Sequence, residues 1–209
     1  ASLETLRRQP KHIEADYGAG VVAHEILKPV SMTRRDGGEL VYDFGQNFAG
    51  VVRMRIINGR DGQTVVVRHA EILNPDGSLN TRFLRTAKAT AAYTCVDASD
   101  APDGVQEYSP RFTYMGFRYV SVRGVSADDL RIEAIVLHSD LRAIGDFECS
   151  DRRLNQLQHN IVWGAKSNFM DIPTDCPQRD ERMGWTGDIA VFSTTACLNF
   201  DMTRFLEKW

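Results

Sequence analysis

The sequence predicts an antiparallel β-sandwich followed by a smaller helical part. In the first two thirds of the chain, apolar residues recur at every second position in short runs, with turn-forming residues between the runs. In the last third they recur at spacings of three and four. The first period is typical of half-buried strands and the second of amphipathic helices. We therefore expect a polar N-terminal arm at residues 1–20 that is frayed, a β-sandwich at 21–140 and a helical part at 141–209.

The strand prediction depends on four segments in which one face is apolar. Turn sequences rich in glycine and asparagine separate the runs at 35–38, 58–62 and 74–77, where tight hairpins need a positive φ. Several short strands at this spacing favour an antiparallel sandwich. The predicted apolar faces are Val52, Met54 and Ile56; Val65 and Val67; Phe117 and Tyr119; and Ile132, Ala134 and Val136.

Three helices are expected after the sandwich. Ser150 is a good N-cap for the first, at about 151–167, and Thr186 or Asp188 could cap the second. Asp201 could cap the third. The apolar faces expected are Leu154, Leu157, Ile161 and Ala165; Ile189, Phe192 and Ala196; and Met202, Phe205 and Trp209.

Composition limits the function classes. The 209 residues carry a net charge of −3, which gives no reason to expect nucleic acid or an anionic membrane as a partner. No apolar run approaches the roughly 18 residues that span a bilayer. The first residues lack an apolar signal-peptide core, and the compartment stays open. Four scattered cysteines match neither a zinc site nor a disulfide framework, so we expect free thiols.

One segment, residues 171–188, concentrates the chemistry of the chain. It holds five carboxylates, two arginines and a tryptophan, and two prolines and two glycines interrupt it. Ionised groups are costly to bury unless they are paired, and proline disfavours a helix interior. The segment is therefore expected to be a loop that presents charge, the kind of segment in which catalytic and binding residues concentrate.

Paired carboxylates beside an aromatic side chain suit the hydrolysis of glycosides. One carboxylic acid protonates the departing oxygen, and a second carboxylate activates water or attacks the sugar. Glu181 is the candidate acid. Neighbouring Asp180 would raise its pKa, whereas Arg179 and Arg182 would lower it. The sequence therefore leaves the direction of the net pKa shift of Glu181 open. Trp185 offers a flat apolar face to a sugar ring.

Hydrogen-bond acceptors for sugar hydroxyls are expected from Asp175 and Asp188. Other chemistries fit less well. The carboxylate spacing differs from that of a calcium-binding loop, and Cys176 has no clear histidine partner, which favours a structural thiol. His69 and His138 are expected to be ordinary sheet residues. We expect no cofactor and no metal ligands.

Five segments carry a resemblance to a known family. Residues 171–188 closely resemble the signature of bacterial α-L-rhamnosidases of glycoside hydrolase family 78, and residues 147–151 resemble the start of that family's catalytic domain. Residues 42–50, 68–73 and 110–119 resemble the family's jelly-roll-like, concanavalin-like domain. The resemblance covers about residues 40–209.

The resemblance implies an inverting glycosidase that removes terminal α-L-rhamnose from glycosides or polysaccharides. It also implies that residues 141–209 are the first helices of an (α/α)6 barrel. The general base of the family lies later in that barrel, so we expect this chain to be a fragment with little or no activity of its own. The general acid maps onto Glu181, and the substrate-binding positions map onto Asp175, Arg179, Asp180, Trp185 and Asp188.

Two other functions stay open, a carbohydrate-binding module and a scaffold that docks other domains. Both would use the sandwich without catalysis. A row of aromatic side chains on the sandwich surface would favour the binding module, whereas inward-facing aromatics would favour the enzyme. Exposed apolar residues of an incomplete helical part also suggest self-association, through Phe192, Phe205, Leu206 and Trp209.

Overall fold

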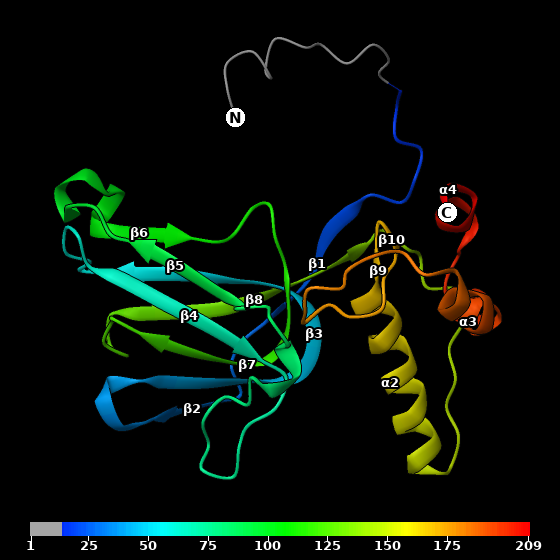
Figure 1. Ribbon diagram of the computed structural model, residues 1–209, viewed down its shortest axis with the longest axis horizontal. Coiled ribbons are helices and arrows are strands. Elements are labelled where there is room, and N and C mark those ends of the chain that lie inside the picture. Colours follow the sequence, from blue (N-terminus) through cyan, green and yellow to red (C-terminus); the bar gives the residue numbers. More distant parts are fainter. Residues whose placement is uncertain (1–13) are drawn as a thin grey trace.

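The computed structural model describes residues 14–209, and there the strands form a curled antiparallel sheet with helices beside it (Figure 1). The strands of this sheet pair in the order β1-β8-β3-β7-β4-β5, and β2 and β6 also pair with β3. They are β1 (Val21–Leu27), β2 (Ser31–Arg34), β3 (Leu40–Ile57), β4 (Thr64–Ala70), β5 (Thr90–Thr94), β6 (Val105–Tyr108), β7 (Met115–Arg123) and β8 (Leu130–Ser139).

The long strand β3 belongs to both layers of the predicted sandwich. Its residues 40–43 pair with β2 and β7, whereas residues 50–56 pair with β8 and residues 54–57 with β6. Between Asp43 and Phe48 the pairing with β7 loses register. At this point Gly45 adopts φ 78°, and its N–H donates to Asp43 over 2.7 Å. The irregularity lets the sheet fold over and enclose its apolar side chains.

The core of the sandwich confirms most of the predicted apolar faces. Val65 and Val67 are buried, and so are Val52, Met54 and Ile56 of β3. The prediction is wrong for β7, where Phe117 and Tyr119 were expected to share the buried face. There Phe117 and Val120 are buried while Tyr119 is only half-buried, because β7 changes its alternation beside the irregular part of β3.

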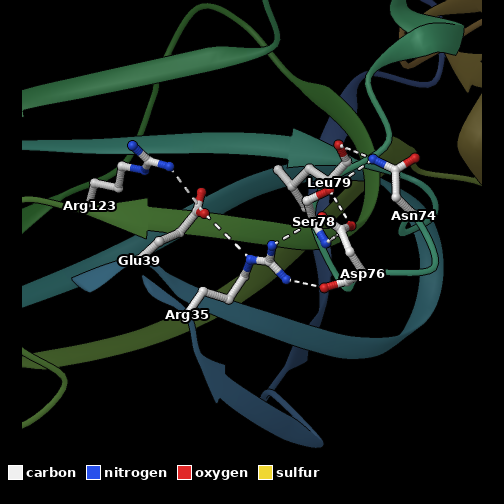
Figure 2. Close-up of polar contacts among 7 residues, drawn as sticks. All are labelled: Arg35, Glu39, Asn74, Asp76, Ser78, Leu79 and Arg123. Atoms are coloured by element: carbon white, nitrogen blue, oxygen red, sulfur yellow. Dashed lines mark hydrogen bonds and ion pairs between the residues drawn. The ribbon is translucent and has the colours of Figure 1, made fainter. Parts of the chain in front are cut away.

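A polar network fixes the hairpin that follows β4 (Figure 2). The predicted turn is present, with Gly77 at φ 79° and its N–H donating to the carbonyl of Asn74 over 2.8 Å. Arg35 donates to the backbone and side chain of Asp76, and Glu39 accepts from Arg123 over 3.2 Å. The network joins the hairpin to the start of β3 and so fixes the chain that leads to residue 85.

The helical part contains α2 (Arg152–Asn168), α3 (Thr186–Asn199) and α4 (Thr203–Lys208), with a two-stranded ribbon of β9 (Phe169–Met170) and β10 (Ile172–Pro173) after α2. The predicted caps are partly wrong. Asp151, not Ser150, caps α2 by accepting the Arg153 N–H over 2.8 Å. Trp185 precedes the first residue of α3, without a side-chain cap. Aspartate is as good an N-cap as serine, so α2 begins one residue later than the sequence predicts.

The helices enclose a second apolar core. Ile189 and Ala196 of α3 are buried as predicted, and Phe205 of α4 is buried against Phe169 at a ring-centroid distance of 4.9 Å. Phe205 is therefore not part of an exposed patch. The first half of the predicted α2 face is exposed, because this helix packs through its later turns. Exposed apolar side chains of the helices include Leu154, Leu157, Val191 and Leu198.

The predicted N-terminal arm lies partly outside the described residues, which begin at residue 14. Its last residues pack against α4 instead of fraying. Ala19 is buried in the helical core, Arg204 donates to the carbonyl of Tyr17, and Lys208 pairs with Asp16 over 2.9 Å. Among residues 14–209, no helix has the length and apolar character needed to cross a membrane.

Candidate active site

The charged segment begins at a tight turn between β9 and β10. Asp171 adopts φ 69° there, a strained conformation for a residue with a Cβ. The ribbon pairs Ile172 with Met170, and the N–H of Thr174 then donates to the carbonyl of Asn168 over 2.8 Å. These bonds tie the start of the loop to the end of α2. The loop expected from the sequence therefore begins at residue 174, after a two-residue strand.

Glu181 lies at the centre of an ion-pair cluster. Its carboxylate is 2.6 Å from the Arg179 guanidinium and accepts a hydrogen bond from Arg85 over 3.1 Å. The Glu181 side chain keeps 28% of its exposure, so it is partly shielded and still open to a ligand. A half-buried carboxyl that two arginines hold in place has a fixed direction, which proton transfer to a bound molecule requires.

Asp175 approaches the same cluster from the other end of the loop. Its Oδ2 accepts the thiol proton of Cys176 over 3.1 Å and lies 4.0 Å from Arg179. Its Oδ1 is buried and has no hydrogen-bond partner among residues 14–209. A buried oxygen without a donor is costly, so this atom is suited to accept a hydrogen bond from a ligand.

The ligand atoms of Asp175, Cys176 and Glu181 lie within 4.8 Å of one another, an arrangement that could hold a metal ion. Two properties argue against that use. Arg179 already supplies a positive charge to both carboxylates. Burial, with the neighbouring Asp175, raises the pKa of the Cys176 thiol to about 11, so a cation would have to displace the thiol proton before the sulfur could bind it.

Asp180 contacts the sandwich, as Glu181 does through Arg85. It accepts a hydrogen bond from the Thr86 hydroxyl, which lowers the pKa of the Asp180 carboxyl below its usual range. The exposed Asp188 is in the first turn of α3, next to the helix N-terminus. Trp185 directly precedes that helix and is 39% exposed.

Two cavities meet at this loop. The first, of about 440 Å³, lies between α2, β10 and α3, and both Asp175 and Asp188 line it. The second, of about 410 Å³, is lined by residues 178–183 and by sandwich residues 87, 89, 113 and 115. The two cavities share no lining residue, and Trp185 lines neither. Asp175 of the first and Glu181 of the second approach within 4.8 Å, so the cavities adjoin there.

The sandwich also contacts the middle of the loop, through Tyr114. The Arg182 guanidinium lies 4.1 Å from the centre of the Tyr114 ring and donates to the carbonyl of Pro177 over 2.9 Å. Burial lowers the pKa of Arg182 and raises that of Tyr114, as expected of groups removed from water. The stacked pair holds the middle of the loop against β7.

Most of the predicted site residues are brought together, and the sandwich adds residues that the sequence did not indicate. Asp175, Arg179 and Glu181 form one cluster, whereas Trp185 and Asp188 lie along the start of α3. Sequence reasoning missed Arg85, Thr86 and Tyr114. They precede their partners in the loop by 68 to 96 residues, and no local pattern distinguishes them.

Comparison with known proteins gives a consistent result for both parts of the chain. Residues 33–138, about half of the chain, match the bacterial alpha-L-rhamnosidase concanavalin-like domain. Residues 142–209 match the bacterial alpha-L-rhamnosidase 6 hairpin glycosidase domain. An alpha-L-rhamnosidase of Streptomyces avermitilis is 43% identical over 202 residues, which are 96% of this chain and 19% of that protein. The chain spans about a fifth of the length of the curated relatives it matches.

Solved structures show the same similarity. The structure of Streptomyces avermitilis alpha-L-rhamnosidase complexed with L-rhamnose superposes with a TM-score of 0.88 at 42% identity, covering 96% of this chain and 19% of that one. The native rhamnosidase from Aspergillus terreus superposes with a TM-score of 0.85 at 44% identity, covering 93% of this chain and 22% of that one. The fold is thus an antiparallel β-sandwich followed by the first helices of an α-barrel.

Proposed function

Because this chain belongs to the bacterial α-L-rhamnosidase family, we propose that it forms part of a glycoside hydrolase that removes terminal α-L-rhamnose from rhamnosides. Residues 21–140 form its sandwich domain and residues 141–209 the first part of its (α/α)6 catalytic domain. The substrates are rhamnose-containing glycosides or polysaccharides, in line with the L-rhamnose complex of the Streptomyces protein.

The proposed chemistry assigns the general acid to Glu181. Its proton passes to the glycosidic oxygen as the bond to the sugar breaks, and a second carboxylate removes a proton from the attacking water. In an inverting enzyme these two carboxyl groups stand roughly 6.5–9.5 Å apart. The observation that carries the proposal is the partly shielded Glu181, which Arg179 and Arg85 hold beside a cavity.

The proposed sugar position is the cavity lined by Asp175 and Asp188. The unpartnered Oδ1 of Asp175 accepts from a sugar hydroxyl, and Asp188 accepts from another. Arg179 orients the two neighbouring carboxylates, and Asp180 holds the loop to the sandwich through Thr86. Trp185 stays a proposed aromatic platform for the sugar, from a position that directly precedes α3 and lies outside the lining of this cavity.

The sandwich itself is a weaker candidate for sugar binding. Phe112 is its fully exposed aromatic side chain, whereas Tyr42, Phe44, Phe48 and Phe117 are buried in its core. They stabilise the fold and cannot form a row on the surface. This inward placement favours the enzyme over the carbohydrate-binding module.

We further propose that the water-activating carboxylate comes from the remainder of a longer chain, since the relatives are about five times as long. Residues 1–209 alone then show little turnover. In the complete protein, the exposed Leu154, Leu157, Val191 and Leu198 pack against later helices. The alternative is that residues 1–209 self-associate through these side chains. The molecular mass of the 209-residue chain in solution shows whether it is a monomer or an oligomer.

The decisive experiment is Glu181→Gln in the complete gene product. A missing general acid matters most when the leaving group is a poor one, because a good leaving group departs without a proton. We expect the variant to lose about 10²–10⁴-fold in kcat on an alkyl α-L-rhamnoside and much less on a dinitrophenyl α-L-rhamnoside. Affinity for free L-rhamnose should be retained. Equal losses on both substrates, or no loss, would remove Glu181 from this role.

A further inference from the structure

The cavity beside Glu181 is built by two domains. On one side it is lined by residues 178–183 of the charged loop. On the other side it is lined by the sandwich residues Ala87, Ala89, Thr113 and Met115. Two polar contacts cross between these walls, from Arg85 to Glu181 and from Thr86 to Asp180. The sandwich therefore supplies the wall that faces the proposed general acid.

The first sandwich segment, residues 85–89, is held in a strained conformation at both ends. Arg85 adopts φ 53° and ψ −113°, and Ala89 adopts φ 44°, although neither is a glycine. The buried His69 holds the far end, since its backbone N–H donates to the carbonyl of Ala89 over 3.0 Å and its Nδ1 is 2.9 Å from the same oxygen. Strain that the surrounding structure maintains is typical of functional segments.

The second sandwich segment connects β6 to β7 and carries an unusual side chain. Phe112 is 100% exposed, whereas the next residue, Thr113, lines the cavity beside Glu181. Met183, on the opposite wall, is also exposed. Figure 1 shows this connection running beside the loop that precedes α3. Phe112 does not itself line the cavity, but it adjoins Thr113, which does, and its fully exposed ring is free to stack on a flat ligand.

The position of Glu181 between two cavities indicates what such a ligand is. A general acid donates its proton to the oxygen that joins the sugar to the leaving group. Asp175 and Asp188 line the cavity on the sugar side, so the cavity walled by the sandwich lies on the leaving-group side. We propose that residues 85–89 and 112–115 of the sandwich form the leaving-group subsite, with Phe112 stacking on its ring.

This inference rests on the proposed function. The leaving group expected has a flat ring with an apolar face and hydroxyls at its edge, as a phenolic ring or a second sugar has. The ring lies on Phe112, and its polar edge meets the cavity-lining carboxylates Asp180 and Glu181, which Thr86 and Arg85 hold in place. The sandwich then determines which rhamnosides are cleaved, while the helical domain holds the rhamnose.

The test compares Phe112→Ala and Phe112→Tyr in the complete gene product. The substrates are a flavonoid α-L-rhamnoside, a rhamnosyl-glucose disaccharide and methyl α-L-rhamnoside, which has no ring to stack. For Phe112→Ala we expect kcat/KM to fall roughly three- to tenfold on at least one ring-bearing substrate and less than about twofold on the methyl glycoside. The Tyr variant should restore the lost activity, and inhibition by free L-rhamnose should not change. Whichever ring-bearing substrate responds identifies the leaving group.

Phe147→Ala is the matched control, because Phe147 is an exposed phenylalanine in the segment between β8 and α2 and, unlike Phe112, is not next in sequence to a residue that lines either cavity. It should not alter the preference among substrates. A loss of equal size on all three substrates with Phe112→Ala, or no loss on any, would overturn the inference while leaving the proposed function intact. Failure of the unmodified protein to cleave any rhamnoside would instead overturn the proposed function.

Discussion

Gly116 of β7 lies directly against the backbone of Gln178 in the charged loop. A Cβ built on Gly116 would stand 2.7 Å from the amide nitrogen of Gln178 and 2.9 Å from the carbonyl carbon of Pro177. Real Cβ atoms do not approach backbone so closely, so a glycine is required at this contact. The sandwich thereby sets the position of the loop that carries Glu181.

The first prediction concerns this contact. Gly116→Ala should push the loop away from β7, lower stability by about 1–3 kcal/mol and reduce kcat/KM of the complete protein. Thermal unfolding and steady-state kinetics measure the two effects. Gly20→Ala is the control, since nothing lies within 4 Å of its added Cβ and it lines neither cavity. That change should raise stability by about 0.4–1 kcal/mol and leave kcat/KM unchanged. A harmless Gly116→Ala would contradict the close packing.

The second prediction concerns the ion pair that closes the irregular part of β3. Arg118 donates to both oxygens of Asp43, over 2.7 and 2.8 Å, and these bonds hold the pKa of Asp43 below its usual range. Asp43→Asn should lower stability at pH 7 by about 1–2 kcal/mol, a range reduced because Arg118 is partly exposed.

The pH dependence of that difference follows from the lowered pKa. A carboxyl whose pKa is depressed on folding stabilises the protein above its unfolded pKa of about 3.9 and loses this contribution as the pH falls through the folded pKa. The difference between wild type and Asp43→Asn should therefore be constant from pH 7 to about pH 5 and shrink below about pH 4. Urea unfolding across this range checks it, and a difference that persists at pH 3 would argue against the ion pair.

The third prediction concerns His69, which is buried beside Phe117 with a ring-centroid distance of 4.8 Å. Burial lowers the pKa of His69 to about 4, so the folded protein holds it neutral. The unfolded chain binds a proton near pH 6.5, and stability should therefore fall as the pH drops from about 6.5 to about 4. His138, whose pKa burial also lowers to about 4, should add a similar slope.

His69→Asn isolates this contribution, because the asparagine amide can reach the same carbonyl and does not titrate. The variant should be less stable at pH 7 through lost ring packing. Its stability should fall less steeply between pH 6.5 and pH 4, by up to about 3 kcal/mol over the interval. Denaturant unfolding at four pH values measures both slopes. Identical slopes would show that His69 does not titrate as its burial requires.

The fourth prediction concerns the cysteines, which are all free. The Cys176 thiol, with its pKa raised to about 11 by burial and by Asp175, should be at least about tenfold slower toward iodoacetamide at pH 8 than the exposed Cys197. Mass spectrometry of partially alkylated protein reads out the order. Cys197→Ser should remove the fast reaction. Preferential labelling of Cys176 would indicate an activated thiol and reopen its role in the site.

The sequence by itself determined the classes of structure and the position of the chemistry. Alternation at Val52, Met54 and Ile56 predicted the sandwich core, and spacings of three and four predicted α2 and α3. These patterns are local, because a strand or helix repeats its buried face within a few residues. The charged loop was also visible, since prolines and clustered charges exclude a buried regular element.

Only the tertiary structure decided which groups surround Glu181. Arg85 contacts Glu181 across 96 residues of sequence. Residue 116 must be a glycine because the backbone of Gln178 in the loop packs directly against it. The burial of Phe205 against Phe169 likewise depends on how the helices pack. Contacts between distant segments leave no periodic signal along the chain, because they arise from the way β3 folds the sheet and the loop then lies on it.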